Sequence, residues 1–315
     1  MNEGAGDGRP TARWGTAACL TAAVVLLSSL ETLPLVLVPL ALLLLTTPSP
    51  RRWRWMLLAV AIGLLGLSVA VSPLGGLSRA WALLLGGAFA LVTVWRPSLA
   101  VLPRALLAVG AAGVAAATGL VVSGQWRGVD GMVRRELVAV SERTFAAAMA
   151  SSPESAWLAE LADAARQVAE LQAELFPGLV ALQSLAALGL GAWIVGRLQP
   201  PADGRFSLRP WRDFRFNDQL VWLLIVGLAL VLLPLADGFS RVGYNLIVFM
   251  TALYALRGVG VFLFVSVGAS SVVMILFGAL AAIFLYPLVL GAAVVVGLGD
   301  TWLDVRGRAV AATRS

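Results

Sequence analysis

Nine apolar runs, most of them close to the length of a membrane crossing, constrain this chain more than any other feature. They cover roughly residues 17–30, 33–47, 54–72, 78–95, 100–123, 177–198, 219–235, 244–267 and 270–298. A helix needs about 20 residues to cross the hydrocarbon core of a bilayer. The runs do not alternate with polar residues, as the strands of a transmembrane barrel would. The sequence therefore predicts an all-α, polytopic transmembrane helical bundle of eight or nine spans.

The residue inventory narrows the chemistry. Hydrophobic residues make up 60% of the chain and charged residues 13%, against about 25% charged in an average soluble domain. There is no histidine or lysine, all 23 basic residues are arginine, and Cys19 is the single cysteine. Histidine-dependent catalysis, a P-loop lysine, a Schiff base and an internal disulfide are therefore excluded. We expect a protein that is not an enzyme, with no cofactor and no metal site.

Four regions follow from the pattern of runs. Residues 1–124 hold five candidate spans, 125–176 form a polar insert, 177–299 hold four candidate spans, and 300–315 are a basic polar tail.

The first two runs are short and are separated by Glu31, Thr32 and Leu33, and Pro34 and Pro39 follow in the second. They predict a tight helical hairpin whose second helix is kinked or re-entrant. No A-x-A cleavage site follows the first run, so we interpret it as a retained helix.

The arginines of the short loops predict the orientation. They gather before run one and between runs two and three, four and five, and six and seven, whereas the alternate loops hold only Arg79 and Arg241. The positive-inside rule then puts the N-terminus and the 199–216 loop in the cytoplasm of a bacterium, with the bundle in the inner membrane. Nine spans would leave the arginine-containing tail outside. A re-entrant 219–235 segment would remove that conflict.

The insert at 125–176 has eight acidic residues and five arginines, a net charge of −3. Ser152-Pro153-Glu154 is typical of a helix start. Beyond it, apolar residues spaced four and three apart form one narrow stripe: Trp157, Leu161, Ala164, Val168, Leu171 and Leu175. The stripe predicts an amphipathic helix against the membrane surface or the bundle, or alternatively a lid or dimerisation helix. An acidic helix binds anionic lipid poorly, so we expect the insert on the outer face.

Two motifs indicate functions that we judge poorly supported. Gly297-Leu298-Gly299-Asp300 spells the GxGD of intramembrane aspartyl proteases, but it ends a run, and the second, Tyr-Asp motif is absent. The segment 210–218 mixes aromatic residues with arginines, as nucleic-acid-binding segments do. It directly precedes an apolar run, where interfacial aromatics and arginines are expected anyway. We therefore expect no nucleic-acid partner, and partners restricted to the lipid bilayer, a small-molecule ligand and other membrane proteins.

Arg257 interrupts an apolar run near its middle. An arginine at the centre of a span costs about 2.5–3.5 kcal/mol on insertion scales, so it normally pairs or faces a wet cavity. Alternatively the helix is shifted and the guanidinium reaches an interface. Tyr254 shares a helix face with Arg257, and Asn245 is close in the sequence. Arg257, Tyr254 and Asn245 are therefore the candidate ligand-binding residues.

Four features in order resemble the YybS-like family of bacterial multi-pass membrane proteins. They are Glu31-Thr-Leu-Pro34 to Pro39, Phe214-Arg-Phe-Asn-Asp218 with Trp222, Tyr254-Ala-Leu-Arg257-Gly258, and Gly299-Asp300-Thr-Trp302-Leu-Asp304-Val-Arg306. Arg257 stands where the family pattern has glutamine. The family has no established activity and is distantly similar to the substrate-binding membrane subunits of energy-coupling-factor vitamin transporters. The resemblance implies an α-helical membrane fold with an outward-facing small-molecule pocket.

Two functions of different classes remain open from the sequence. The first is the binding or transport of a small molecule by a bacterial inner-membrane protein. The second is a structural or assembly role through protein partners, without a ligand. Intramembrane proteolysis ranks third.

Overall fold

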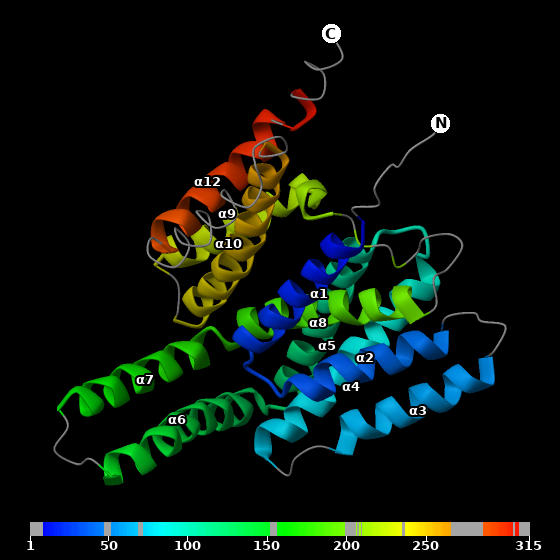
Figure 1. Ribbon diagram of the computed structural model, residues 1–315. Coiled ribbons are helices and arrows are strands. Elements are labelled where there is room, and N and C mark those ends of the chain that lie inside the picture. The colour runs from blue at the N-terminus through cyan, green and yellow to red at the C-terminus, as the bar shows by residue number, and fades with distance from the viewer. Residues whose placement is uncertain are drawn as a thin grey trace, which may run out of the picture. The chain divides into compact units, whose positions relative to one another are not determined.

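The computed structural model describes residues 9–46, 52–68, 72–151, 156–198, 206, 208, 210–234, 237–265, 286–304 and 306–308. Within these ranges the chain forms helices and no strand (Figure 1). They divide into two compact units, one made of Ala17–Leu208 and the other of Arg209–Ser315 with Met1–Thr16. The predicted all-α, polytopic bundle is confirmed.

Eleven α-helices and two 3-10 turns are assigned in the described residues. They are α1 (Arg9–Leu26), α2 (Thr32–Thr46), α3 (Arg52–Ser68), α4 (Pro73–Trp95), α5 (Val101–Val122), α6 (Trp126–Ser151), α7 (Ala156–Glu174), α8 (Phe176–Leu198), η1 (Trp211–Asp213), η2 (Asp218–Leu220), α9 (Val221–Leu232), α10 (Asp237–Val265) and α12 (Tyr286–Leu303). Four of these, α4, α5, α8 and α10, contain a segment long and apolar enough to cross a membrane, and five shorter apolar helices accompany them.

Four prolines lie in the first turn of a helix, where a proline is tolerated best, whereas Pro39 lies inside α2. Pro73, Pro103, Pro177 and Pro287 lie in the first turns of α4, α5, α8 and α12, where the missing N–H has no intrahelical partner in any case. The Oγ of Ser72 caps α4 by accepting the Gly75 N–H at 2.8 Å. The helices begin at these residues, and the apolar runs continue them toward the length of a membrane crossing, about 30 Å of hydrocarbon.

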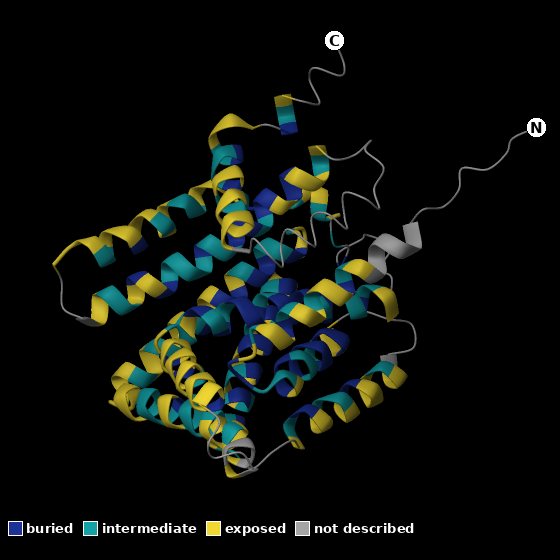
Figure 2. Cartoon of the chain, turned by 60° about the vertical axis from the view of Figure 1, so that its left-hand side comes forward, coloured by how far each residue is buried: buried dark blue, intermediate teal, exposed yellow. Residues whose placement is uncertain are grey.

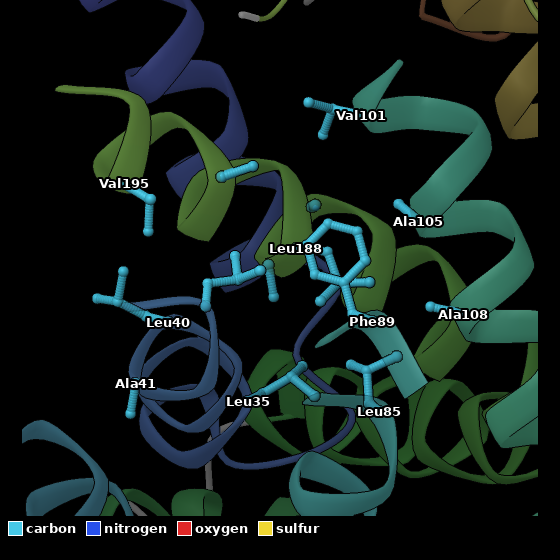
Figure 3. Packing of buried hydrophobic residues seen from close by; sticks show 14 of the residues in the cluster. Leu35, Leu40, Ala41, Leu85, Phe89, Val101, Ala105, Ala108, Leu188 and Val195 are labelled. Atoms are coloured by element: carbon cyan, nitrogen blue, oxygen red, sulfur yellow. The ribbon is translucent and has the colours of Figure 1, made fainter. Parts of the chain in front are cut away.

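The core of the Ala17–Leu208 unit lies between α2, α4, α5 and α8. Leu35 and Leu40 of α2 meet Phe89 of α4 and Leu188 of α8, and Ala108 of α5 closes the far side (Figure 3). Figure 2 shows buried residues on the inward faces of the helices and exposed ones on the outward faces. Outward apolar faces are what helices in lipid require, since lipid is as apolar as the core.

The predicted break between the first two runs is present, but α1 and α2 are not among the helix pairs in close contact, so a tight hairpin stays a prediction. α1 ends at Leu26 and α2 begins at Thr32. α2 continues as one α-helix through Pro39 to Thr46. Gly86 of α4 lies against it, since a Cβ at Gly86 would be 3.1 Å from the Cα of Pro39. α2 is the central helix of this unit, and it packs on α3, α4 and α8.

The polar insert holds two helices, α6 and α7, which pack side by side (Figure 1). α6 was not anticipated, because its sequence has no apolar period. The helix start proposed at Ser152-Pro153-Glu154 lies outside the described residues. The buried positions of α7 are Leu158, Ala169 and Ala173. The predicted stripe does not pack on the bundle: Trp157, Leu161, Val168 and Leu171 are exposed.

Candidate functional site

A buried charged cluster lies in the Arg209–Ser315 unit, where α10 crosses α12. Glycines let the two backbones approach. A Cβ at Gly258 would overlap the carbonyl oxygen of Ala293, and one at Gly297 would overlap that of Tyr254. This contact explains one glycine of the GxGD sequence as a packing residue. A Cβ at Gly299 would meet nothing within 4 Å.

Arg257 occupies the centre of the cluster and is 2% exposed. Its Nε donates to Oδ2 of Asp300 at 3.0 Å, and one terminal nitrogen donates to the Asp300 carbonyl oxygen at 3.2 Å. The other terminal nitrogen donates to Oδ1 of Asp218 at 2.6 Å. A guanidinium cannot shed its proton to escape burial, so it must find acceptors. The chain itself supplies them.

Asp300 is the shared acceptor of two arginines. Besides Arg257, Arg306 donates to its Oδ2 at 2.7 Å, and the Asp300 side chain is 0% exposed. Arg306 also donates from one nitrogen to the carbonyl oxygens of Arg212 and Phe214, at 2.9 and 3.1 Å. The side chain of Asp218 is 59% exposed, so the cluster opens to solvent on that side. The two arginines and two carboxylates balance in charge.

Aromatic rings cover one face of the cluster. The Arg257 guanidinium carbon lies 5.4 Å from the centroid of the Phe216 ring. Phe216 in turn meets Tyr254 edge-to-face at 5.2 Å between centroids, and Phe214 at 6.3 Å. Cation–π contact of this kind stabilises a partly desolvated guanidinium. The segment 211–217, which resembled a nucleic-acid-binding sequence, therefore packs its aromatic residues against the protein.

The cluster does not bring all three predicted site residues together. Tyr254 and Arg257 are part of it. Asn245 lies 12 positions before Arg257, about 18 Å along α10, and donates to the Arg241 carbonyl oxygen at 2.9 Å. No carboxylate partner of Arg257 was identified from the sequence. The fold brings both to it across 39 and 43 positions of sequence.

The contacts of Arg306 also bear on topology. The residues after α12 touch the segment before α9, because Arg306 reaches Arg212 and Phe214. Two segments in contact lie on one side of a membrane, so the chain crosses an even number of times between them. α9 has only 12 residues, about 18 Å, too short for a full span. A non-crossing α9 fits the re-entrant alternative for 219–235, and the number of spans stays a prediction.

A second polar site lies in the Ala17–Leu208 unit, at the break between α1 and α2. Gln183 of α8 is 0% exposed. Its Oε1 accepts the N–H groups of Ser29 and Leu30 at 3.2 and 3.3 Å, and its Nε2 donates to the Leu30 carbonyl at 3.1 Å. Non-helical backbone within an apolar bundle requires such internal partners. The sequence analysis missed Gln183, although a lone amide in the 177–198 run was a usable signal.

Glu31 directly follows Ser29 and Leu30 in the chain. Its N–H donates to the Oγ of Ser78 at 3.0 Å, and its Oε1 accepts the Ser72 hydroxyl at 3.0 Å. Its other oxygen, Oε2, is buried and has no hydrogen-bond partner among the described residues. Nearby on the same helices, the Trp81 indole donates to the Oγ of Ser184 at 2.9 Å. The site thus holds one carboxylate oxygen able to accept a further hydrogen bond.

Arg104 is a third buried polar residue, which was not among the candidates named from the sequence. It is 0% exposed in the first turn of α5, and its guanidinium carbon lies 5.4 Å from the Phe206 ring centroid.

No three Asp, Glu or Cys side chains come together as metal ligands in the part of the chain that the structure describes. Two carboxylates that share a proton are the requirement of an aspartyl protease. At Asp300 the neighbouring carboxylate, Asp218, is separated from it by Arg257.

The comparisons with known proteins agree with this architecture. No curated protein and no solved structure matches the chain. A family model described as "Predicted membrane protein (DUF2232)" matches residues 16–301, which is most of the sequence and includes Glu31, Gln183, Arg257 and Asp300. The chain therefore belongs to the DUF2232 family of predicted membrane proteins.

Proposed function

We propose that this membrane protein binds a small molecule at the polar break between α1 and α2, without catalysing a reaction. The observation that carries the proposal is the Oε2 atom of Glu31, which is buried and has no partner among the described residues. A buried acceptor without a partner costs about 1–3 kcal/mol, and more when it is charged. A ligand that donates a hydrogen bond there recovers that free energy.

The surrounding residues support binding rather than a purely structural role. Gln183 holds the backbone of Ser29 and Leu30 in place, so the position of Glu31 is preorganised. Small-molecule sites commonly combine an apolar wall with a few fixed polar groups. The matching ligand class is a small molecule with an amine, amide or hydroxyl group. Glu31 also begins the first motif that resembles the YybS-like family, and the outward-facing pocket implied by the transporter likeness fits the predicted outer side of this break.

Ligand binding at Arg257, Tyr254 and Asn245 stays a prediction from the sequence. It rested on the position of Arg257 in an apolar run, where an arginine must pair or face a wet cavity. Its three nitrogens now have acceptors in Asp300 and Asp218. We therefore place the proposed ligand at Glu31 and treat Arg257 as a structural residue. The proposed location is the inner membrane of a bacterium, with the N-terminus in the cytoplasm, from the distribution of arginines.

The test is a thermal-shift screen of the purified protein with small molecules that carry amine, amide or hydroxyl donors. Each ligand-induced shift is read against the same variant without ligand. We expect a stabilising compound for the wild type, with the shift lost in Glu31→Gln. The shift should be kept in Glu160→Gln, a matched removal of an exposed carboxylate. A ligand whose shift survives Glu31→Gln would contradict the proposed site.

A second function, assembly through protein partners, is favoured by a separate observation. The large apolar residues of α7 are exposed on a helix that also carries several acidic residues. This surface does not involve Glu31 or Arg257.

A further inference from the structure

The α6–α7 pair is a helical hairpin that packs through small residues. Ala169 and Ala173 are the buried positions in the second half of α7, and Val133 is buried on α6. Small side chains allow two helices to approach closely. The larger apolar residues of α7 are therefore not needed to hold the hairpin together. The hairpin makes only few contacts with α4, α5 and α8, so its far end projects from the helices of this unit (Figure 1).

α7 leads directly into the apolar helix α8. Only Leu175 separates them, and helical hydrogen bonds continue across it, from Leu175 N to Leu171 O and from Leu179 N to Leu175 O, both 3.0 Å. α8 is long and apolar enough to span a membrane. α7 therefore extends away from the end of that span for 19 residues, about 28 Å. A helix that continues a span leaves the lipid, and it does not lie flat on the membrane surface.

An unpartnered apolar stripe follows the length of α7. Trp157 is 68% exposed, and Leu161, Val168 and Leu171 are about half exposed. Their spacing of four and three is that of the seam of a coiled coil. Away from lipid, a continuous row of large apolar side chains is a surface for a protein partner.

The charges of α7 select the kind of partner. Its acidic residues are Glu160, Asp163, Glu170 and Glu174, and its single arginine, Arg166, lies 3.6 Å from Glu170. A second copy of this helix would bring two faces of the same negative sign together, and anionic lipid would be repelled as well. A helix with basic residues beside an apolar seam is complementary to both the apolar stripe and the negative charge of α7.

We propose that the exposed stripe of α7, Trp157 to Leu171, is a docking surface for a basic amphipathic helix of another protein. The stripe supplies apolar contact area, and Glu160, which immediately precedes the seam position Leu161, supplies negative charge that orients the partner, whereas Glu174 lies 3.9 Å from Arg134 of α6. This surface is independent of the small-molecule site proposed at Glu31.

The experiment uses the full chain in nanodiscs of zwitterionic phosphatidylcholine, so that the lipid itself does not attract basic peptides. The probe is a fluorescent synthetic helix of about three heptads, with leucine at the seam and arginine at the flanking positions. A second peptide replaces each arginine by glutamate. Binding is measured by fluorescence anisotropy at low and high salt. We expect the basic peptide to bind, more weakly as salt rises, and the acidic peptide not to bind.

Variants then locate the binding. Leu161→Ser with Val168→Ser should weaken the basic peptide by about tenfold or more, while far-UV circular dichroism stays unchanged because the hairpin packs through other residues. Val140→Ser, an exposed apolar residue of α6, is the matched control and should bind as the wild type does. Failure of the basic peptide to bind, equal binding of the acidic peptide, or unchanged binding in the double variant would overturn the proposal. So would self-association of the protein that the double variant abolishes, since the occupant would then be a second copy.

Discussion

Asp300 offers the sharpest test of the structure, because two buried cations depend on one of its oxygens. Asp300→Asn keeps the shape of the side chain and removes the charge that Arg257 and Arg306 share at 3.0 and 2.7 Å. Removing one partner of a buried ion pair costs about 3–5 kcal/mol, because the remaining charge stays buried without compensation. Both arginines are at most 4% exposed. We expect Asp300→Asn to fall in the upper part of that range.

Two further variants show how the loss of stability depends on the burial of the residue that is changed. Arg257→Gln leaves Asp300 with Arg306, and it frees Asp218, which is already 59% exposed. Its cost should be about 1–3 kcal/mol. Asp218→Asn removes only the acceptor on the exposed side of Arg257, where water can replace it, so its cost should be about 1 kcal/mol. The expected order of destabilisation is therefore Asp300→Asn, then Arg257→Gln, then Asp218→Asn.

The assay is equilibrium unfolding in mixed micelles, with helix content followed by circular dichroism and no ligand present. The free energy of unfolding of each variant is compared with that of the wild type. A loss for Asp218→Asn as large as that for Asp300→Asn would refute the reasoning, because burial would then not decide the cost. An unchanged Arg257→Gln would show that the guanidinium reaches an interface instead of the buried acceptors.

Three other predictions follow from the same structure. Gly258→Ala should lower the free energy of unfolding by about 1–3 kcal/mol, because its methyl group meets the α12 backbone, whereas Gly299→Ala, with open space at its Cβ, should not; equal effects in unfolding titrations would contradict the helix crossing. In a cysteine-free background, a cysteine at Ala150 should react with an impermeant label from outside and one at Arg308 should be spared, and the reverse pattern would overturn the orientation. Leu161→Glu should leave the rate of proteolysis of the insert unchanged, because Leu161 is exposed; faster cleavage would mean that the stripe packs on the hairpin or the bundle.

The sequence predicted the helices well and their contacts less well. Apolar runs locate α4, α5, α8 and α10 because lipid imposes length and composition on any span. The packing of the insert was predicted less well. The apolar stripe that begins at Trp157 indicated that its large residues form the packed face. The structure buries Leu158, Ala169 and Ala173 instead, and two of these three are small, as two helices in close contact require. A hydrophobic period indicates a face, but it does not say what covers that face.

Only part of the charged cluster was predicted from the sequence, and the reason is physical. A lone arginine in an apolar run indicates that an acceptor exists, so Arg257 was found. The acceptor itself depends on which helices cross, and Asp300 is 43 positions away. Glycine at position 258 permits that crossing, yet a single glycine in a membrane helix is too common to identify its partner. Gln183 was missed because a buried amide satisfies backbone groups, and the sequence does not reveal which turn it faces.

The position of Asp300 near the end of the last helix has a consequence for biogenesis. Arg257 leaves the ribosome well before Asp300 and Arg306 do, and during that interval the buried partners it has in the finished fold are not yet present. Until the last turns of α12 have been made, the only carboxylate partner available to Arg257 is Asp218, which precedes it in the chain. Loss of those few residues would leave the guanidinium without its buried acceptor, Asp300.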